Sequence, residues 1–131
     1  MTPTHTPAHL YPGLLLLTLI GWMHFRDVPS KLAETPYLGW LYILLVAGCA
    51  AAGAWLLSSH WRNGYLLGGV ISVGAIVAYS LTRSTGLPGA TGDIGNWAEP
   101  SGLISLGAEA AFALLALLAL RGRRQDATGG F

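Results

Sequence analysis

Charge is scarce in this sequence, whereas long apolar runs are abundant. Charged residues make up only 10% of the 131 residues, against about 25% in ordinary soluble domains. The seven Lys and Arg nearly balance the six Asp and Glu, so the chain has no strong field to attract nucleic acid. The apolar residues, 53% of the total, fall into blocks, which is the pattern of an integral membrane protein. At this length we expect a single domain.

Cysteine is nearly absent, and so are the features of a cleavable leader. Cys49 is the only cysteine, which excludes an intramolecular disulfide and any paired-cysteine metal or redox motif. Its neighbours are glycine and alanine, so we interpret it as a small packing residue. Residues 1–9 contain no Lys or Arg, and no Ala-x-Ala site follows the first apolar run. We therefore expect that run to be a retained helix rather than a signal peptide.

Four apolar blocks stand out, at residues 9–25, 37–57, 64–82 and 102–120. Inside a bilayer, the backbone must satisfy its own hydrogen bonds, and none of the blocks alternates as a barrel strand does. The sequence therefore predicts an all-α fold, a four-transmembrane-helix bundle in the lipid bilayer with a tail at 121–131.

The distribution of arginine predicts the orientation in the membrane. An even number of spans puts both termini on one side, and the arginines within residues 121–124 indicate that this side is cytoplasmic. Arg62 agrees with this orientation, whereas Arg26, Lys31 and Arg83 oppose it. We predict a multi-pass protein of the cell membrane with both termini cytoplasmic.

Two polar connections would then lie outside the cell. In the first, residues 26–36, Pro29 and Pro36 should break the helix. The second, residues 83–101, is a long extracytoplasmic loop between the third and fourth helices. Loops of that length in a small domain are usually functional or disordered. Its apolar side chains lead us to expect that it folds over the outer end of the bundle.

Glu109 is the most informative residue, because it carries the only charge in residues 102–120. A carboxylate in such a helix costs about 2.5–3.5 kcal/mol on insertion scales unless a partner offsets the cost. Small residues share its helical face: Gly102, Ser105, Ala113 and Ala116. That face suits close helix packing with the carboxylate directed inward.

Tyr79 and Arg83 are the partners that we expect for Glu109. Counting from the block ends at 1.5 Å per residue puts Glu109 about 12 Å and Tyr79 about 6 Å below the outer surface. Either long side chain closes much of that gap. Two interpretations stay open: a structural pair that fixes helix register, or a site for a polar head group, a quinone or a proton-coupled ligand.

A second polar group gathers at the predicted outer rim. Its members are His24, Arg26, Asp27, Arg83, Asp93, Trp97 and Glu99. His24 together with Glu109 suggests a shallow acid/base or metal pocket. In the alternative, His24 caps a helix end and Arg26 and Asp27 form a solvated charge pair. The candidate ligand-binding residues are Glu109, Tyr79, Arg83, His24, Trp97 and Ser105.

The other histidines give only a weak metal signal. His5 and His9 are four residues apart, as in a helical ligand pair, but prolines interrupt that segment. His60 falls on the same predicted side, so a site of three imidazoles stays open. His24 and His60 belong to opposite sides, which disfavours haem held between them.

Acidic and amide residues in the long loop give a similarly weak metal signal. Asp93, Asn96 and Glu99 are three apart in a glycine-rich segment, but the dense EF-hand pattern of calcium ligands is missing. The alternative is that Pro100 begins the fourth helix, with Glu99 beside its positive N-terminal end.

A ridge of small residues, Gly64, Gly68 and Ser72, opens the third helix. Such a ridge allows close helix contact. We expect most of it to be used inside the bundle, with the remainder free for a homo-oligomer or for docking on a larger complex.

The layout of residues 14–82 resembles the DoxX-like four-helix membrane proteins. The resemblance rests on the basic turn at residues 29–32, the Pro-Tyr-Leu-Gly at 36–39, the small residues at 48–53, the short turn with Arg62, and the glycine-rich third helix. It implies a quinone- or redox-associated membrane subunit. Residues 85–101 and the helix of Glu109 lie outside it, so it implies no catalytic residue.

Three classes of function follow. The first is an accessory or assembly subunit of a larger membrane complex, possibly redox-linked, because the chain is small and lacks a cofactor motif. The second is a quinone-, lipid- or small-molecule-binding membrane protein that uses Glu109. The third is an oligomeric transporter or channel unit, although the expected inverted repeat is missing. The sequence assigns no enzyme activity, and quinone is the one cofactor that it suggests.

Overall fold

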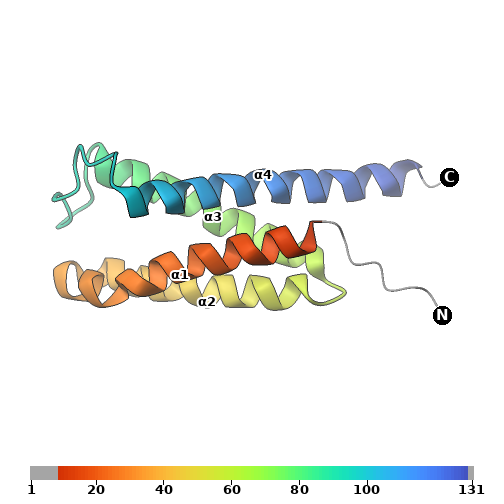
Figure 1. Cartoon of the computed structure of the whole chain (residues 1–131), viewed down its shortest axis with the longest axis horizontal. Coiled ribbons are helices and arrows are strands. Elements are labelled where there is room, and N and C mark those ends of the chain that lie inside the picture. The colour runs from red at the N-terminus through yellow and green to blue at the C-terminus, as the bar shows by residue number, and fades with distance from the viewer. Residues whose placement is uncertain (1–8, 130–131) are drawn as a thin grey trace.

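Four helices run up and down along one axis in the computed structural model, which describes residues 9–129, with side chains up to Gly122. They are α1 (Leu10–Glu34), α2 (Pro36–Leu56), α3 (Trp61–Arg83) and α4 (Pro100–Gly129). Each packs against two neighbours, in the order α1–α2–α3–α4 around the bundle. α1 begins and α4 ends at the same end, and residues 84–99 cross the other end (Figure 1).

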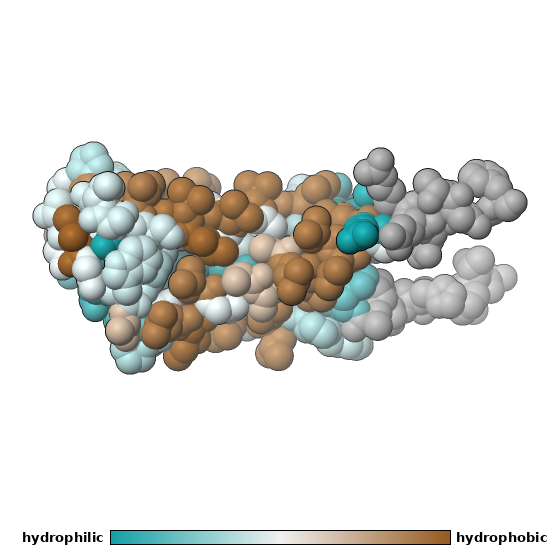
Figure 2. Space-filling view, turned by 90° about the horizontal axis from the view of Figure 1, so that it is seen from above, coloured by the Kyte–Doolittle hydropathy of each residue, from teal (hydrophilic) through white to brown (hydrophobic). Residues whose placement is uncertain are grey.

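Three of these helices are long and apolar enough to cross a membrane: α2, α3 and residues 100–122 of α4. Large apolar side chains cover their outer faces, and they form a brown belt between two paler, more polar ends (Figure 2). So large a continuous apolar surface is rare on soluble proteins and is typical of contact with a membrane. The chain is therefore an all-α protein embedded in a membrane.

Helix α1 is much longer than predicted. We expected it to end at residue 25 and Pro29 to break it, but Pro29 lies inside the helix, which ends at Glu34. A proline removes one backbone donor, and the following turns keep their own hydrogen bonds, up to the bond from the Thr35 nitrogen to the Lys31 carbonyl. Pro36 does interrupt the chain, because it begins α2.

The other boundaries differ less. α3 begins at Trp61 instead of residue 64, and α2 ends at Leu56. α4 begins at Pro100, which confirms the alternative to a metal site in the loop. It continues through residues 121–129, which we predicted to be a tail.

Small residues allow the helices to approach closely. A Cβ at Gly64 would lie 2.6 Å from the Ala52 carbonyl oxygen, and one at Gly68 would lie 2.4 Å from the Phe112 ring. Gly64, Gly68 and Ser72 are all buried. The small-residue ridge is thus used inside the bundle.

Residues 84–99 are tied to the bundle by backbone acceptors. The Tyr37 hydroxyl donates to the Pro88 carbonyl, and the Thr35 hydroxyl donates to the Gly89 carbonyl at 3.3 Å. The Tyr79 hydroxyl donates to the Trp97 carbonyl at 3.0 Å. These bonds fix the loop to the first turn of α2 and the last turns of α3.

Candidate functional site

A cavity of about 1290 Å³ lies between the helices at the loop end. All four helices and the loop contribute to its lining. Small-molecule pockets usually measure about 300–1,000 Å³, so this one is large enough for a ligand. It contains two polar clusters and an apolar wall.

Glu109 is the centre of the inner cluster. Its side chain is only 2% exposed, and it lines the cavity. Ser105, one helical turn earlier, donates a hydrogen bond to Glu109 Oε2 at 3.1 Å. The Nε2 of His24, from α1, lies 3.7 Å from the same oxygen. The structure thus brings together three of the predicted site residues.

The hydrogen bond of the His24 ring to the backbone fixes its tautomer. Its Nδ1 lies 2.9 Å from the Ile20 carbonyl oxygen, and a carbonyl only accepts, so Nδ1 carries the hydrogen. In the neutral ring, Nε2 is then an acceptor that faces the Glu109 carboxylate, a second acceptor. The two atoms are 3.7 Å apart and form no hydrogen bond with each other. A donor hydrogen on an imidazolium, on a carboxylic acid or on a ligand would turn this approach into a favourable contact.

Tyr42 completes the inner cluster, and the sequence analysis missed it. Its ring packs edge-on against His24, with 4.8 Å between the ring centres, and it lines the cavity. Within residues 9–122 its hydroxyl makes no hydrogen bond. The available signal was its place inside the second apolar block, away from the interfacial ends where tyrosine is usual.

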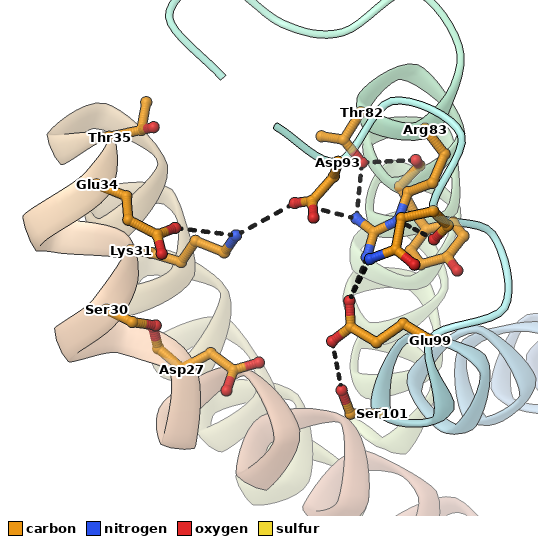
Figure 3. Close-up of polar contacts among 12 residues, drawn as sticks. Asp27, Ser30, Lys31, Glu34, Thr35, Thr82, Arg83, Asp93, Glu99 and Ser101 are labelled. Atoms are coloured by element: carbon orange, nitrogen blue, oxygen red, sulfur yellow. Dashed lines mark hydrogen bonds and ion pairs between the residues drawn. The ribbon is translucent and has the colours of Figure 1, made fainter. Parts of the chain in front are cut away.

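The outer cluster closes the loop end of the cavity. Arg83, only 9% exposed, pairs with Glu99 at 3.1 Å and with Asp93 at 3.8 Å. Asp93 also pairs with Lys31 of α1 at 3.6 Å. Figure 3 shows Asp93 between the two basic residues, so this one loop carboxylate joins α3 to α1. Ser101 donates to the other oxygen of Glu99 at 2.8 Å.

Tyr79 and Arg83 do not contact Glu109, which corrects our prediction of its partners. The Arg83 guanidinium lies 4.1 Å from the centre of the Tyr79 ring, and the Tyr79 hydroxyl bonds the backbone of Trp97. The loop supplies carboxylates at the same level as Arg83, whereas Glu109 lies two turns further into α4 than Ser101, about 12 Å at helical rise. Arg83 therefore pairs with the nearer loop carboxylates rather than with Glu109.

The apolar wall reaches the outer surface between α2 and α3. Leu41 and Leu44 of α2 line the cavity and are 53% and 67% exposed. Opposite them on α3, Gly74 also lines the cavity, and a Cβ there would meet nothing within 4 Å. Deeper in the bundle, a Cβ at Gly48 would lie 2.6 Å from Ile71. The two helices are therefore in contact at the level of Gly48 and Ile71 and separated nearer the loop end, at the level of Gly74.

Among residues 9–122, no group of three or more His, Cys, Asp and Glu side chains could hold a metal ion. His9 instead bonds Tyr65, with 2.7 Å between Nδ1 and the hydroxyl oxygen. His5 lies outside the described residues. In the loop, Asn96 donates to Glu99 at 3.2 Å, and the two loop carboxylates face Arg83.

Comparisons with protein-family models, with curated proteins and with solved structures found no match. The resemblance to DoxX-like proteins therefore stays a prediction.

Proposed function

We propose that this chain is a membrane protein that binds a lipophilic small molecule or lipid in the cavity described above. The observation that carries the proposal is the buried Glu109 carboxylate, directed into a cavity of about 1290 Å³. Burying an ionisable group is costly, and such groups are found mainly at functional sites. A buried carboxylate in a cavity is therefore a site candidate.

The lining suits an amphipathic ligand. Glu109, His24, Ser105 and Tyr42 offer polar contacts at the inner end. The charged outer cluster closes the loop end, and leucines and small residues dominate the apolar wall. The separation between α2 and α3 gives a lipophilic tail a way to reach the bilayer without crossing water. Ligand sites commonly combine such an apolar surface with a few polar groups.

The proposed topology completes this account. We propose that α1 is a fourth span, because residues 10–25 lie along the spanning helix α2 and expose large apolar side chains such as Leu15 and Trp22. The cavity and residues 84–99 would then face the outer side of the cell membrane, with both termini cytoplasmic, as the arginines near the end of α4 favour.

The second class from the sequence is therefore preferred here. The accessory subunit, whether redox-linked or not, and the oligomeric transporter remain predictions, since no feature of the described residues favours either one specifically. Trp97 belongs to the site only through its backbone bond to Tyr79 and the packing of the two rings, 5.9 Å apart. A direct ligand contact by Trp97 stays a prediction.

Native mass spectrometry of protein extracted in a mild detergent tests the proposal. We expect a small molecule bound at fixed stoichiometry in the wild type, and its loss in Gly74→Leu, where a leucine fills the separation between α2 and α3. The matched control is Gly107→Leu, another helical glycine with nothing within 4 Å of its Cβ, which lies outside the cavity lining.

A wild type that carries no small molecule, and that takes up none from added lipid extract, contradicts the proposal. Equal loss in Gly74→Leu and Gly107→Leu also contradicts it, because the effect would then be one of general stability.

A further inference from the structure

We propose that the ligand of the cavity is a protonated amine with a lipophilic chain, whose head group donates a hydrogen bond to Glu109. This inference rests on the proposed function and adds the charge and chemistry of the head group. Three features lead to it: the sign of the lining charges, the pairing of each charged residue, and the lack of a donor between Glu109 and the Nε2 of neutral His24.

The charges that line the cavity are mostly negative. Two basic side chains, Lys31 and Arg83, reach the lining. The acidic side chains there are Asp27, Glu34, Asp93, Glu99 and Glu109. A concave site with an excess of one sign concentrates ligands of the opposite sign. A cationic head group is therefore attracted, and an anionic one is repelled.

Both basic residues already have anionic partners. Lys31 lies 3.7 Å from Glu34 and 3.6 Å from Asp93, and Arg83 pairs with Asp93 and Glu99. Figure 3 shows these contacts running from α1 across the loop to α3 and α4. A phosphate or carboxylate head group would have to break pairs that include a 90% buried guanidinium, which is costly.

Glu109 differs from the other four lining carboxylates. Asp27 pairs with Arg26 at 3.3 Å, and the loop acids and Glu34 pair with Lys31 or Arg83. Within the described side chains, Glu109 has no Lys or Arg partner, only Ser105 and the imidazole of His24. A buried carboxylate needs compensation by a positive charge or by donors. An ammonium N–H in the cavity supplies both.

The same ammonium resolves the contact between Glu109 and His24. Nε2 of the neutral ring and Oε2 of the carboxylate are both acceptors, 3.7 Å apart, and an N–H⁺ group beside them is a donor to either one. The ring of Tyr42 packs edge-on against His24 and also lines the cavity, and a cation that contacts the face of that ring gains a cation–π contribution.

Three amphiphiles with one chain length separate the head-group charges. Dimethyldodecylamine, dodecanol and dodecanoate are titrated at neutral pH into the full chain in phosphatidylcholine nanodiscs, with saturable stoichiometry as the readout. We expect the amine to bind at least about tenfold more tightly than the alcohol, as a charge-assisted hydrogen bond implies. The carboxylate should bind most weakly.

Glu109→Gln should reduce amine affinity about tenfold or more and leave dodecanol affinity nearly unchanged. The control is Ser72→Ala, which alters a fully buried polar side chain of the bundle that does not line the cavity. It should bind the amine like the wild type.

Two results overturn the inference in different ways. If dodecanol or dodecanoate binds as tightly as the amine in the wild type, and Gly74→Leu abolishes that binding, the cavity holds a ligand but not a cation. If no probe binds saturably, and Gly74→Leu behaves like Gly107→Leu, the proposed function fails as well. The comparison of head groups in the wild type decides the first point even if Glu109→Gln does not fold.

Discussion

Replacing Gly64 by alanine should destabilise the bundle, because α3 meets α2 at this residue without room for a methyl group. A Cβ at position 64 would lie 2.6 Å from the Ala52 carbonyl oxygen and 2.9 Å from the Leu56 backbone nitrogen. Ordinary van der Waals contact begins at 3.4 Å. Backbone atoms of a helix do not turn aside as the end of a side chain does, so the two helices must separate.

The magnitude follows from two opposing terms. Overpacking of this kind costs about 1–3 kcal/mol, and the rigid backbone contacts favour the upper half of that range. Alanine regains up to about 1 kcal/mol of helix propensity. The net loss should therefore be about 1–2 kcal/mol. In the matched control, Gly107→Ala, the Cβ meets nothing within 4 Å, so the propensity gain remains alone and stability should rise by about 0.5–1 kcal/mol.

Unfolding in mixed micelles, titrated with sodium dodecyl sulfate and followed by circular dichroism, measures both variants against the wild type. The predicted result is a change of opposite sign in the two alanine variants. If both variants shift stability by the same amount in the same direction, then α2 and α3 do not approach each other closely at Gly64.

Three further predictions follow from the polar contacts. In a double-mutant cycle, Glu109→Gln and His24→Gln should show a coupling of about 0.5–3 kcal/mol in the free energy of unfolding; additive effects would contradict their contact. Asp93→Asn should speed amide hydrogen exchange in residues 84–95 and lower the free energy of unfolding by less than about 1 kcal/mol, because its pair with Lys31 is partly exposed; unchanged exchange would contradict the role of Asp93 in holding the loop. Partial burial lowers the pKa of His9 from 6.5, so protonation favours the unfolded chain. Stability should fall as the pH decreases below about 6.5, and unfolding of His9→Gln across this range should lack that fall.

The apolar blocks predicted the all-α fold because hydropathy over some 20 residues is a local property of the sequence. Three of the four blocks lie in helices with the composition of a membrane span. The extension of α1 to Glu34 was not predictable in the same way. Pro29 predicts a break in the helix. The residues that follow it keep their helical hydrogen bonds, and these outweigh the loss of one donor at the proline.

The site was predictable only in part, for a related reason. The stripe of small residues around Glu109 indicated an inward face, and the charge itself marked the residue as a candidate. Its partners depend on which helix lies opposite and on the path of residues 84–99. That path brings Asp93 and Glu99 to Arg83 and leaves His24 beside Glu109. Spacing along one helix carries no information about either arrangement.

Tyr42 shows the same limit from the other direction. Its place inside the second apolar block sets it apart from an interfacial tyrosine, but the sequence does not show what it contacts, and it becomes a site residue because α1 places His24 against its ring. Contacts between helices, rather than the periodicity of any one helix, define this cavity.

The most direct test of the cavity account is solution NMR of methyl-labelled protein in deuterated detergent with a protonated dodecyl probe. We predict intermolecular nuclear Overhauser effects from the probe chain to the methyl groups of Leu41, Leu44 and Ile71, which line the cavity. Leu114 and Leu117 of α4, which are about as exposed as Leu41 and Leu44, should show none. Equal effects on both sets, or effects on α4 alone, would contradict a ligand site between α2 and α3.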